Sequence, residues 1–169
     1  MFRHRLLVLL ALLSWFAACA DAPAAPVPWP EPLAADADCT LESALVPGVP
    51  GSPGHLIRSS RNPNGDSELS ALMRRFIDDL YAARAAVEAG KPVTPMFPTH
   101  RRMRCSWFTK PAERDALYDG MAQGYLASVQ AFDATPSQAT YNAIINSCAA
   151  CHSVKCGGPL DYIDGMRWR

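Results

Sequence analysis

The chain has 169 residues, with 16 basic and 16 acidic side chains, so its formal net charge is zero. This balance excludes the basic surface that nucleic-acid binding requires. About 150 residues remain after the leader segment described next, which suits one domain.

Residues 1–19 have the layout of an export signal. MFRHR is basic, LLVLLALLSWF is apolar but too short to span a bilayer comfortably, and small residues follow. Ala18-Cys19-Ala20 fits ordinary cleavage, whereas Phe16-Ala17-Ala18-Cys19 resembles a bacterial lipobox in which Cys19 is lipidated. We predict an exported, periplasmic protein, either soluble or held at a membrane only through a lipid on Cys19. Loss of the leader leaves 14 basic residues against 16 acidic ones.

Residues 20–65 are expected to form a tether or extended arm. Eight prolines lie between Asp21 and Gly54, among alanine, glycine and serine, and large apolar residues are scarce. Cys39 is the exception, because a disulfide there would pin the arm to the domain that follows.

A first helix is predicted from Asp66 or Ser67, either of which is a good N-cap, to Gly90. Its apolar residues recur at spacings of three and four and share one face. They are Leu69, Leu72, Met73, Phe76, Leu80, Ala83 and Val87. Residues 91–108 contain three prolines, so we expect an ordered loop with one short helix around His100 to Cys105.

Two further helices are predicted before the C-terminal tail. Thr109 caps one that runs through Phe132, with Pro111 in its first turn. Thr135 caps the other, with Gln138 completing a capping box, and Gly157-Gly158-Pro159 stops it. No segment shows the alternation of a strand. The prediction is therefore an all-α domain over residues 66–169, built as an antiparallel helical bundle.

The last of these helices carries Cys148, Cys151 and His152 in the pattern CxxCH. Residues three and four apart lie on one side of a helix, so all three side chains point the same way. Two thiols at this spacing attach a haem covalently through its vinyl groups, and the adjacent imidazole binds the iron. We predict one haem c, held by Cys148 and Cys151, with His152 as the proximal ligand.

Two other interpretations of the motif stay open. A zinc site would need a fourth ligand, which Cys156, Cys105 or His100 would supply. A redox disulfide would need a thioredoxin-like strand–helix setting, which the sequence does not predict.

Residues 117–152, LYDGMAQGYLASVQAFDATPSQATYNAIINSCAACH, resemble the last two helices of the cytochrome c′ family. The first helix, ending VEAGKP, is also similar to that family's first helix. The resemblance implies an antiparallel four-helix bundle with haem between the helices. It also implies the same roles for Cys148, Cys151 and His152. The proline-rich region 91–108 departs from the family, so we expect the second helix to be short or irregular.

The resemblance further implies that a residue of the first helix covers the other face of the iron. An apolar residue there gives a five-coordinate, gas-binding protein, whereas methionine gives a six-coordinate electron carrier. Leu72 and Met73 lie near that position. Met73 is the candidate sixth ligand, with packing in the core as the other interpretation, and the weaker candidates are His100, Met103, Met121 and Met166. His100 is expected to be exposed, because it lies in a loop beside arginines.

Other side chains are predicted to surround the haem or to brace the domain. Tyr125 and Tyr141 lie on the faces that would line the pocket. Most of the arginines at 101, 102 and 104 are expected to be solvated, with one pairing with haem propionates. Of Cys39, Cys105 and Cys156, two should pair, and a disulfide at Cys156 would brace the proximal side; the three pairings stay open.

The sequence thus predicts a single-haem c-type cytochrome that passes one electron to or from a redox partner protein. Catalysis is not implied, because no pair of acid–base residues or second metal cluster is evident. A homodimer is an open option. The alternatives are a five-coordinate gas-binding protein of the cytochrome c′ type and a disulfide-braced module that binds zinc or another protein.

Overall fold

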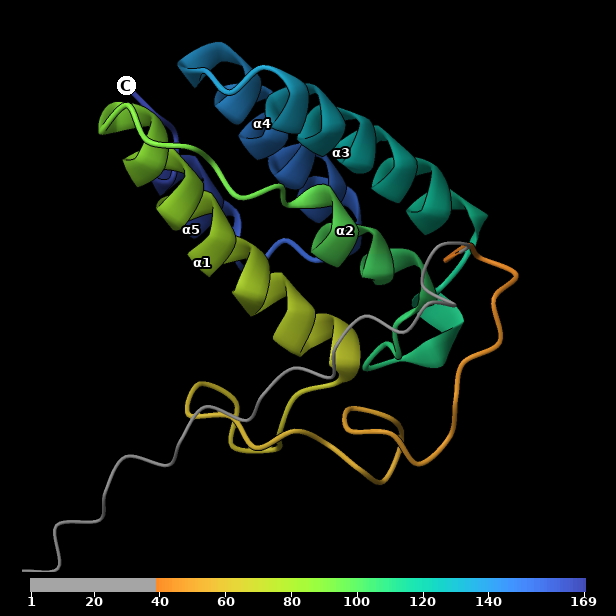
Figure 1. Cartoon of the computed structure of the whole chain (residues 1–169). Helices are drawn as coiled ribbons and strands as arrows, with labels where there is room; N and C mark the ends of the chain where they lie inside the picture. The colour runs from red at the N-terminus through yellow and green to blue at the C-terminus, as the bar shows by residue number, and fades with distance from the viewer. Residues whose placement is uncertain (1–38) are drawn as a thin grey trace, which may run out of the picture. The chain divides into compact units, whose positions relative to one another are not determined.

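The computed structural model of the chain describes residues 39–169 (Figure 1). The predicted leader, Cys19 and residues 20–38 of the predicted arm lie outside the described residues. The described part is all-α: it contains helices and no strand, with one isolated bridge between Ile57 and Asp66. None of its helices is sufficiently long and apolar to span a membrane.

Helix α1 spans Glu68–Glu88, and its predicted start at Ser67 is confirmed. The Ser67 side chain caps the helix by accepting a hydrogen bond from the backbone N–H of Ser70. Gly90 follows the last turn with a φ of +62°, a conformation that glycine adopts at little cost. The buried face consists of Leu72, Phe76, Leu80 and Ala83.

The second helical region is short, as expected. Helix α2 covers Phe97–His100, and the 3₁₀ helix η2 continues over Arg101–Cys105. The carboxylate of Asp133, at the far end of α3, accepts hydrogen bonds from the backbone N–H groups of Met96 and Phe97. This carboxylate fixes the start of α2 against α3.

Helix α3 spans Ala116–Ala134, so its predicted start at Thr109 was wrong. Asp115 is the N-cap and accepts from the N–H of Tyr118. The hydroxyl of Thr109 instead shares hydrogen bonds with Ser67 and Ser70, at the start of α1. Pro111 begins a separate 3₁₀ turn, η3 (Pro111–Glu113).

Helix α4 spans Gln138–Lys155 and starts two residues later than predicted. Ser137, not Thr135, is the N-cap, and Thr140, not Gln138, completes the capping box through reciprocal hydrogen bonds. A short turn joins α4 to α3, and the two helices lie side by side in opposite directions (Figure 1).

The C-terminal tail packs back on α4, as expected. Helix α5 covers Leu160–Gly165 and contacts α4. The Tyr141 hydroxyl donates to the carbonyl of Met166 at 3.3 Å, and the Asn142 side chain bonds both the N–H and the carbonyl of Trp168. Helices α3 and α4 pack closely along their backbones, whereas α1 and α4 make few backbone contacts. This leaves room for a cavity between α1 and α4.

The proline-rich segment 39–65 forms a series of turns at the end of the helical domain where α1 begins (Figure 1). The Trp107 indole donates to the carbonyl of Val46 at 2.7 Å, and the Arg114 guanidinium donates to the carbonyls of Thr40 and Ser43, each at 2.9 Å. Gly51 has a φ of +89°, and a Cβ there would lie 2.3 Å from the backbone nitrogen of Glu68. Only glycine permits this approach.

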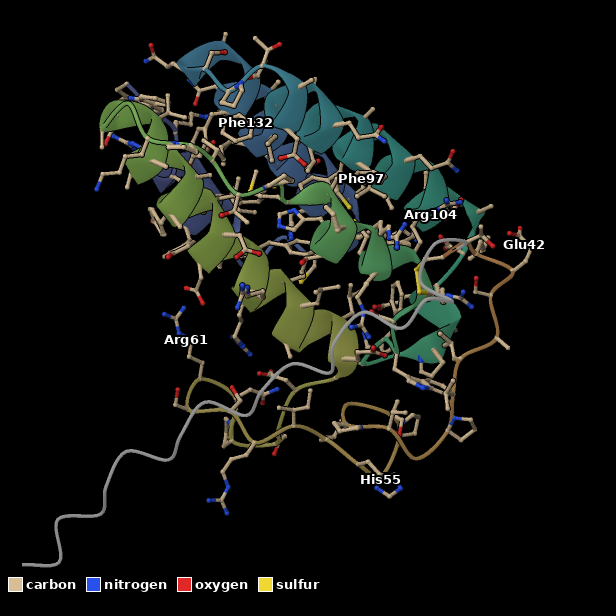
Figure 2. All side chains as sticks on the ribbon, viewed as in Figure 1. Glu42, His55, Arg61, Phe97, Arg104 and Phe132 are labelled. Carbon is tan, nitrogen blue, oxygen red and sulfur yellow. A yellow bond between two sulfur atoms is a disulfide. The ribbon has the colours of Figure 1, made fainter. Side chains whose placement is uncertain are left out.

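A disulfide joins Cys39 to Cys105, 66 residues apart, and so links this segment to the end of η2. Figure 2 shows the bond in yellow close to Arg104. The pairing that the sequence left open is thereby assigned. Cys156 is a free, exposed thiol, so the expectation that a disulfide at Cys156 braces the proximal side was wrong.

Removal of this disulfide should lower the free energy of unfolding. In Cys39→Ser with Cys105→Ser, the unfolded chain regains the entropy of an open loop, a loss of stability of about 2–4 kcal/mol. Denaturant unfolding monitored by circular dichroism measures the difference. Cys156→Ser is the matched control, since it removes an exposed, unpaired thiol and should leave the midpoint nearly unchanged. Equal midpoints for all three proteins would contradict the prediction.

Candidate functional site

A cavity of about 400 Å³ collects most of the side chains that the sequence singles out. Cys148, Cys151 and His152 line it from α4, Met73 lines it from α1, and Tyr125 lines it from α3. Residues 75 positions apart in the chain therefore face the same space. A volume of this order is ordinary for sites that bind small molecules or cofactors.

Cys148 and Cys151 are free thiols facing this cavity and are not bonded to each other. Burial raises the pKa of the Cys148 thiol to about 12, and burial also raises the pKa of Cys151. Both are therefore neutral at physiological pH. A thiol–disulfide centre requires the opposite, a thiol whose pKa is lowered so that it attacks as the thiolate. This environment disfavours the redox-disulfide interpretation.

The orientation of His152 is fixed by the end of its own helix. Its Nδ1 lies 3.0 Å from the carbonyl oxygen of Cys156. A carbonyl only accepts hydrogen bonds, so Nδ1 must carry the hydrogen and Nε2 keeps its lone pair. A backbone acceptor on one nitrogen is the usual way in which proteins prepare the other nitrogen to bind a metal.

The wall opposite α4 is largely apolar. Around Met73, helix α1 contributes four apolar side chains, namely Leu69, Phe76, Ile77 and Leu80. Met103 and Met166 also line the cavity, and both are almost fully buried. Met121 is not among the lining residues. Three of the four methionines considered as iron ligands thus face the cavity.

The two tyrosines occupy different environments. Tyr125 lines the cavity, and burial raises the pKa of its hydroxyl well above the ordinary value. Tyr141 is not among the cavity's lining residues. It packs edge-on against Phe132 and Trp168 and serves to hold the C-terminal tail.

His100 is fully buried, so the expectation that it is exposed was wrong. Its ring stacks on Phe76 with centroids 3.8 Å apart, and its Nδ1 lies 2.7 Å from the Tyr125 hydroxyl. Its Nε2 faces the carboxylate of Asp79 at 3.4 Å, close enough for attraction but without a well-formed hydrogen bond. His100 is not among the lining residues of the cavity and lies behind Phe76.

The arginines beside His100 are also less solvated than expected. Arg104 forms a two-pronged pair with Asp119, whose pKa it lowers, and Arg102 pairs with Glu68. Long-range partners in α3 and α1 explain the difference, because nothing near the arginines in the sequence provides these carboxylates.

Of the three fourth ligands considered for zinc, Cys156 is a free thiol that lines the same cavity as the motif, whereas Cys105 and His100 are engaged elsewhere. Cys105 is in a disulfide and His100 is engaged by Tyr125. Across residues 39–169, no three His, Cys, Asp or Glu side chains cluster in a way that could hold a metal ion.

The chain matches no family model, no curated protein and no solved structure. The site is therefore interpreted from its own geometry.

Sequence reasoning missed the cluster of Asp79, His100 and Tyr125. Asp79 reads as one of several charged residues off the apolar face of α1, and His100 belongs to an irregular region. Their meeting depends on contacts between α1, α2 and α3, for which the sequence carries no local signal.

Acidification should destabilise the protein through His100. Burial lowers the pKa of His100 below its ordinary value near 6.5, so below that pH the unfolded chain binds a proton that the folded chain resists binding. The stability that neutral His100 contributes to the free energy of unfolding is therefore fully present above about pH 6.5. It is lost as the pH falls toward the folded-state pKa, with a slope of at most about 1.4 kcal/mol per pH unit.

Urea unfolding of the full chain at a series of pH values measures this slope, and His100→Gln should abolish it. The carboxylates of Asp66, Asp115 and Asp119 have lowered pKa values, so their losses begin only as the pH approaches about 4, well below the pH at which the His100 loss begins. An unchanged slope in His100→Gln would assign the effect to another group.

Proposed function

We propose that the protein is an exported c-type cytochrome with a single haem, which transfers one electron at a time to or from a redox partner protein. The observation that carries this proposal is the meeting of both thiols, the His152 imidazole and the Met73 thioether around one apolar cavity. Each group comes from the position that the CxxCH motif and the first helix predict. Haem would supply a ferric/ferrous couple, the chemistry that one-electron transfer needs.

The thiols fit covalent attachment. Cys148 and Cys151 would each form a thioether when S–H adds across a vinyl group, the sulfur bonding to carbon and the hydrogen passing to the other vinyl carbon. No oxidant is consumed, and the product is a neutral sulfur. Buried, neutral sulfur suits the apolar surroundings that raise the pKa values of these thiols.

His152 and Met73 are the residues that would bind the haem iron. Because Nδ1 of His152 donates to the Cys156 carbonyl, Nε2 is the nitrogen available to iron. Met73 would be the sulfur donor on α1, where most of its neighbours along the cavity wall are apolar. A thioether ligand stabilises the reduced iron and favours electron transfer.

The rim offers two cations for the carboxylates of a haem. Arg74 and Lys155 line the cavity, and each is paired with an aspartate of the chain, Asp66 and Asp115 respectively. Arg101, Arg102 and Arg104 do not line the cavity, so Arg74 and Lys155 are the cations placed to pair with the propionates.

The five-coordinate, gas-binding alternative has one specific observation in its favour. Four apolar side chains surround Met73 on the α1 wall, and any of them would leave the sixth position of the iron open. Removal of the Met73 sulfur separates the two functions, as described below.

Covalent haem should depend on the two motif thiols. The full chain, expressed with its own leader in a host that matures c-type haems, should keep its colour after denaturing extraction. Cys148→Ala with Cys151→Ala should lose it completely, because no thioether can form. Cys156→Ser is the matched control: it removes the third free thiol at the same cavity and should retain the haem. A colourless wild-type protein containing zinc would support the zinc-module alternative.

Substitution of Met73 should change the spin state of the iron. If its sulfur is the sixth ligand, Met73→Ala converts a low-spin absorption spectrum to a high-spin one and gives rapid carbon monoxide binding. Met121→Ala, outside the cavity, should leave the spectrum unchanged. A wild type that is already high-spin would instead support the gas-binding alternative. A low-spin Met73→Ala would direct the assignment to Met103 or Met166.

A further inference from the structure

The cluster around His100 lies between two cavities. On one side, Phe76 and Tyr125 contact its ring and also line the 400 Å³ cavity. On the other side, Asp79 lines a second cavity of about 270 Å³, together with Met96 and Thr99 from the start of α2. The side chain of Asp79 is 18% exposed, whereas His100 is fully buried. The titratable ring of His100 thus contacts a lining residue of each cavity: Phe76 and Tyr125 on one side, and Asp79 on the other.

The partners of His100 define its neutral form. The Asp79 carboxylate can only accept, so the hydrogen of the neutral ring belongs on Nε2, facing Oδ2 at 3.4 Å. Nδ1 is then the acceptor, and the Tyr125 hydroxyl donates to it at 2.7 Å. This arrangement leaves one nitrogen able to take a second hydrogen, provided that the hydroxyl turns away.

Charged groups of both signs lie near the His100 ring. Asp79 on α1 and Asp133 on α3 favour the imidazolium, while Arg75 on α1 opposes it. Burial is the largest influence and favours the neutral ring, lowering its pKa. Tyr125 itself faces Asp79, Asp133, Tyr118 and the Cys148 thiol. A change of charge nearby therefore shifts the protonation equilibrium of His100.

We propose that His100 is a proton-binding site linked to reduction at the neighbouring cavity, so that the protein takes up a proton together with its electron. This inference rests on the proposed function. The electron comes from the redox partner protein and reduces ferric iron to ferrous. The proton comes from solvent and converts the His100 imidazole to imidazolium, with Nε2–H toward Asp79 and Nδ1–H toward the Tyr125 oxygen.

The coupling is electrostatic. An added electron removes one positive charge from the cavity, and the Phe76 and Tyr125 rings each contact His100 and line that cavity. Charges interact strongly across such a weakly polar space, so reduction favours the imidazolium. By reciprocity, a proton on His100 makes reduction easier.

The test is the midpoint potential of the haem-loaded full chain from about pH 5 to about pH 8, the range in which histidines titrate. Covalent haem is first established by the denatured spectrum, so failure of the proposed function is seen before any potential is measured. The potential should rise as the pH falls, with a limiting slope of about 59 mV per pH unit for one proton per electron. In His100→Gln, which cannot titrate, the slope in this window should disappear.

Two variants on α1 form a matched pair. Asp79→Asn removes the carboxylate that favours the imidazolium and should move the sloping region to lower pH. Asp78→Asn removes the same charge from the adjacent, exposed position and should leave the region in place. These variants keep the test decisive if His100→Gln fails to fold.

Histidine ring signals in nuclear magnetic resonance spectra give a second readout. The pKa of His100 should be higher in the reduced protein than in the oxidised protein. A wild-type potential that does not change with pH overturns the inference, as does a slope that persists in His100→Gln. Equal His100 pKa values in the two oxidation states also overturn it.

Discussion

The stacking of Phe76, His100 and Tyr125 is the contact on which the rest of the domain depends. The three rings are nearly parallel, and they join α1, α2 and α3 at one place. Because α2 inserts its histidine here, α1 is held apart from α3 and α4 instead of closing onto them. Phe76 and Tyr125 line the cavity, and Cys148, Cys151 and His152 of α4 face the same space. Asp133 secures the arrangement by capping α2 from α3.

Burial of an imidazole within this stack has a cost that its partners offset. A neutral histidine with an unsatisfied nitrogen would be unfavourable, so Tyr125 supplies a hydrogen bond and Asp79 an electrostatic partner. At the start of α1, Glu68 accepts from the N–H of Trp107 and pairs with Arg102, while the disulfide holds η2 to the segment before α1. Helix α1 is thus held at its start and near its middle, and the cavity wall between these points is mostly apolar, with Ser70 and Arg74 as its polar residues.

Features determined by short-range patterns were predictable from the sequence. The spacing of Leu72, Phe76 and Leu80 defines α1, and the spacing of Cys148, Cys151 and His152 places them on one face. Helix starts were less secure in α3 and α4, because several capping residues lie close together and only tertiary contacts choose between them. The Thr109 hydroxyl forms its hydrogen bonds at the start of α1, and Asp115 caps α3 instead. The burial of His100 and the pairing of Arg104 with Asp119 depend on residues far away in the chain, so no local pattern indicates them.

The end of α4 shows how a stop signal determines the orientation of a functional side chain. The backbone N–H of Cys156 donates to the carbonyl of His152, and the His152 imidazole donates back to the carbonyl of Cys156. In a continuing helix, the Cys156 carbonyl would accept from a backbone N–H four residues later. That position is occupied by Leu160, but Pro159 lacks an N–H and the two preceding glycines disfavour helix. The helix therefore ends at Lys155, and the Cys156 carbonyl is left without a helical partner. It accepts the hydrogen bond from Nδ1 of His152, which leaves the lone pair of Nε2 available to a metal. The GGP sequence after the motif thus contributes to the site as directly as the motif itself.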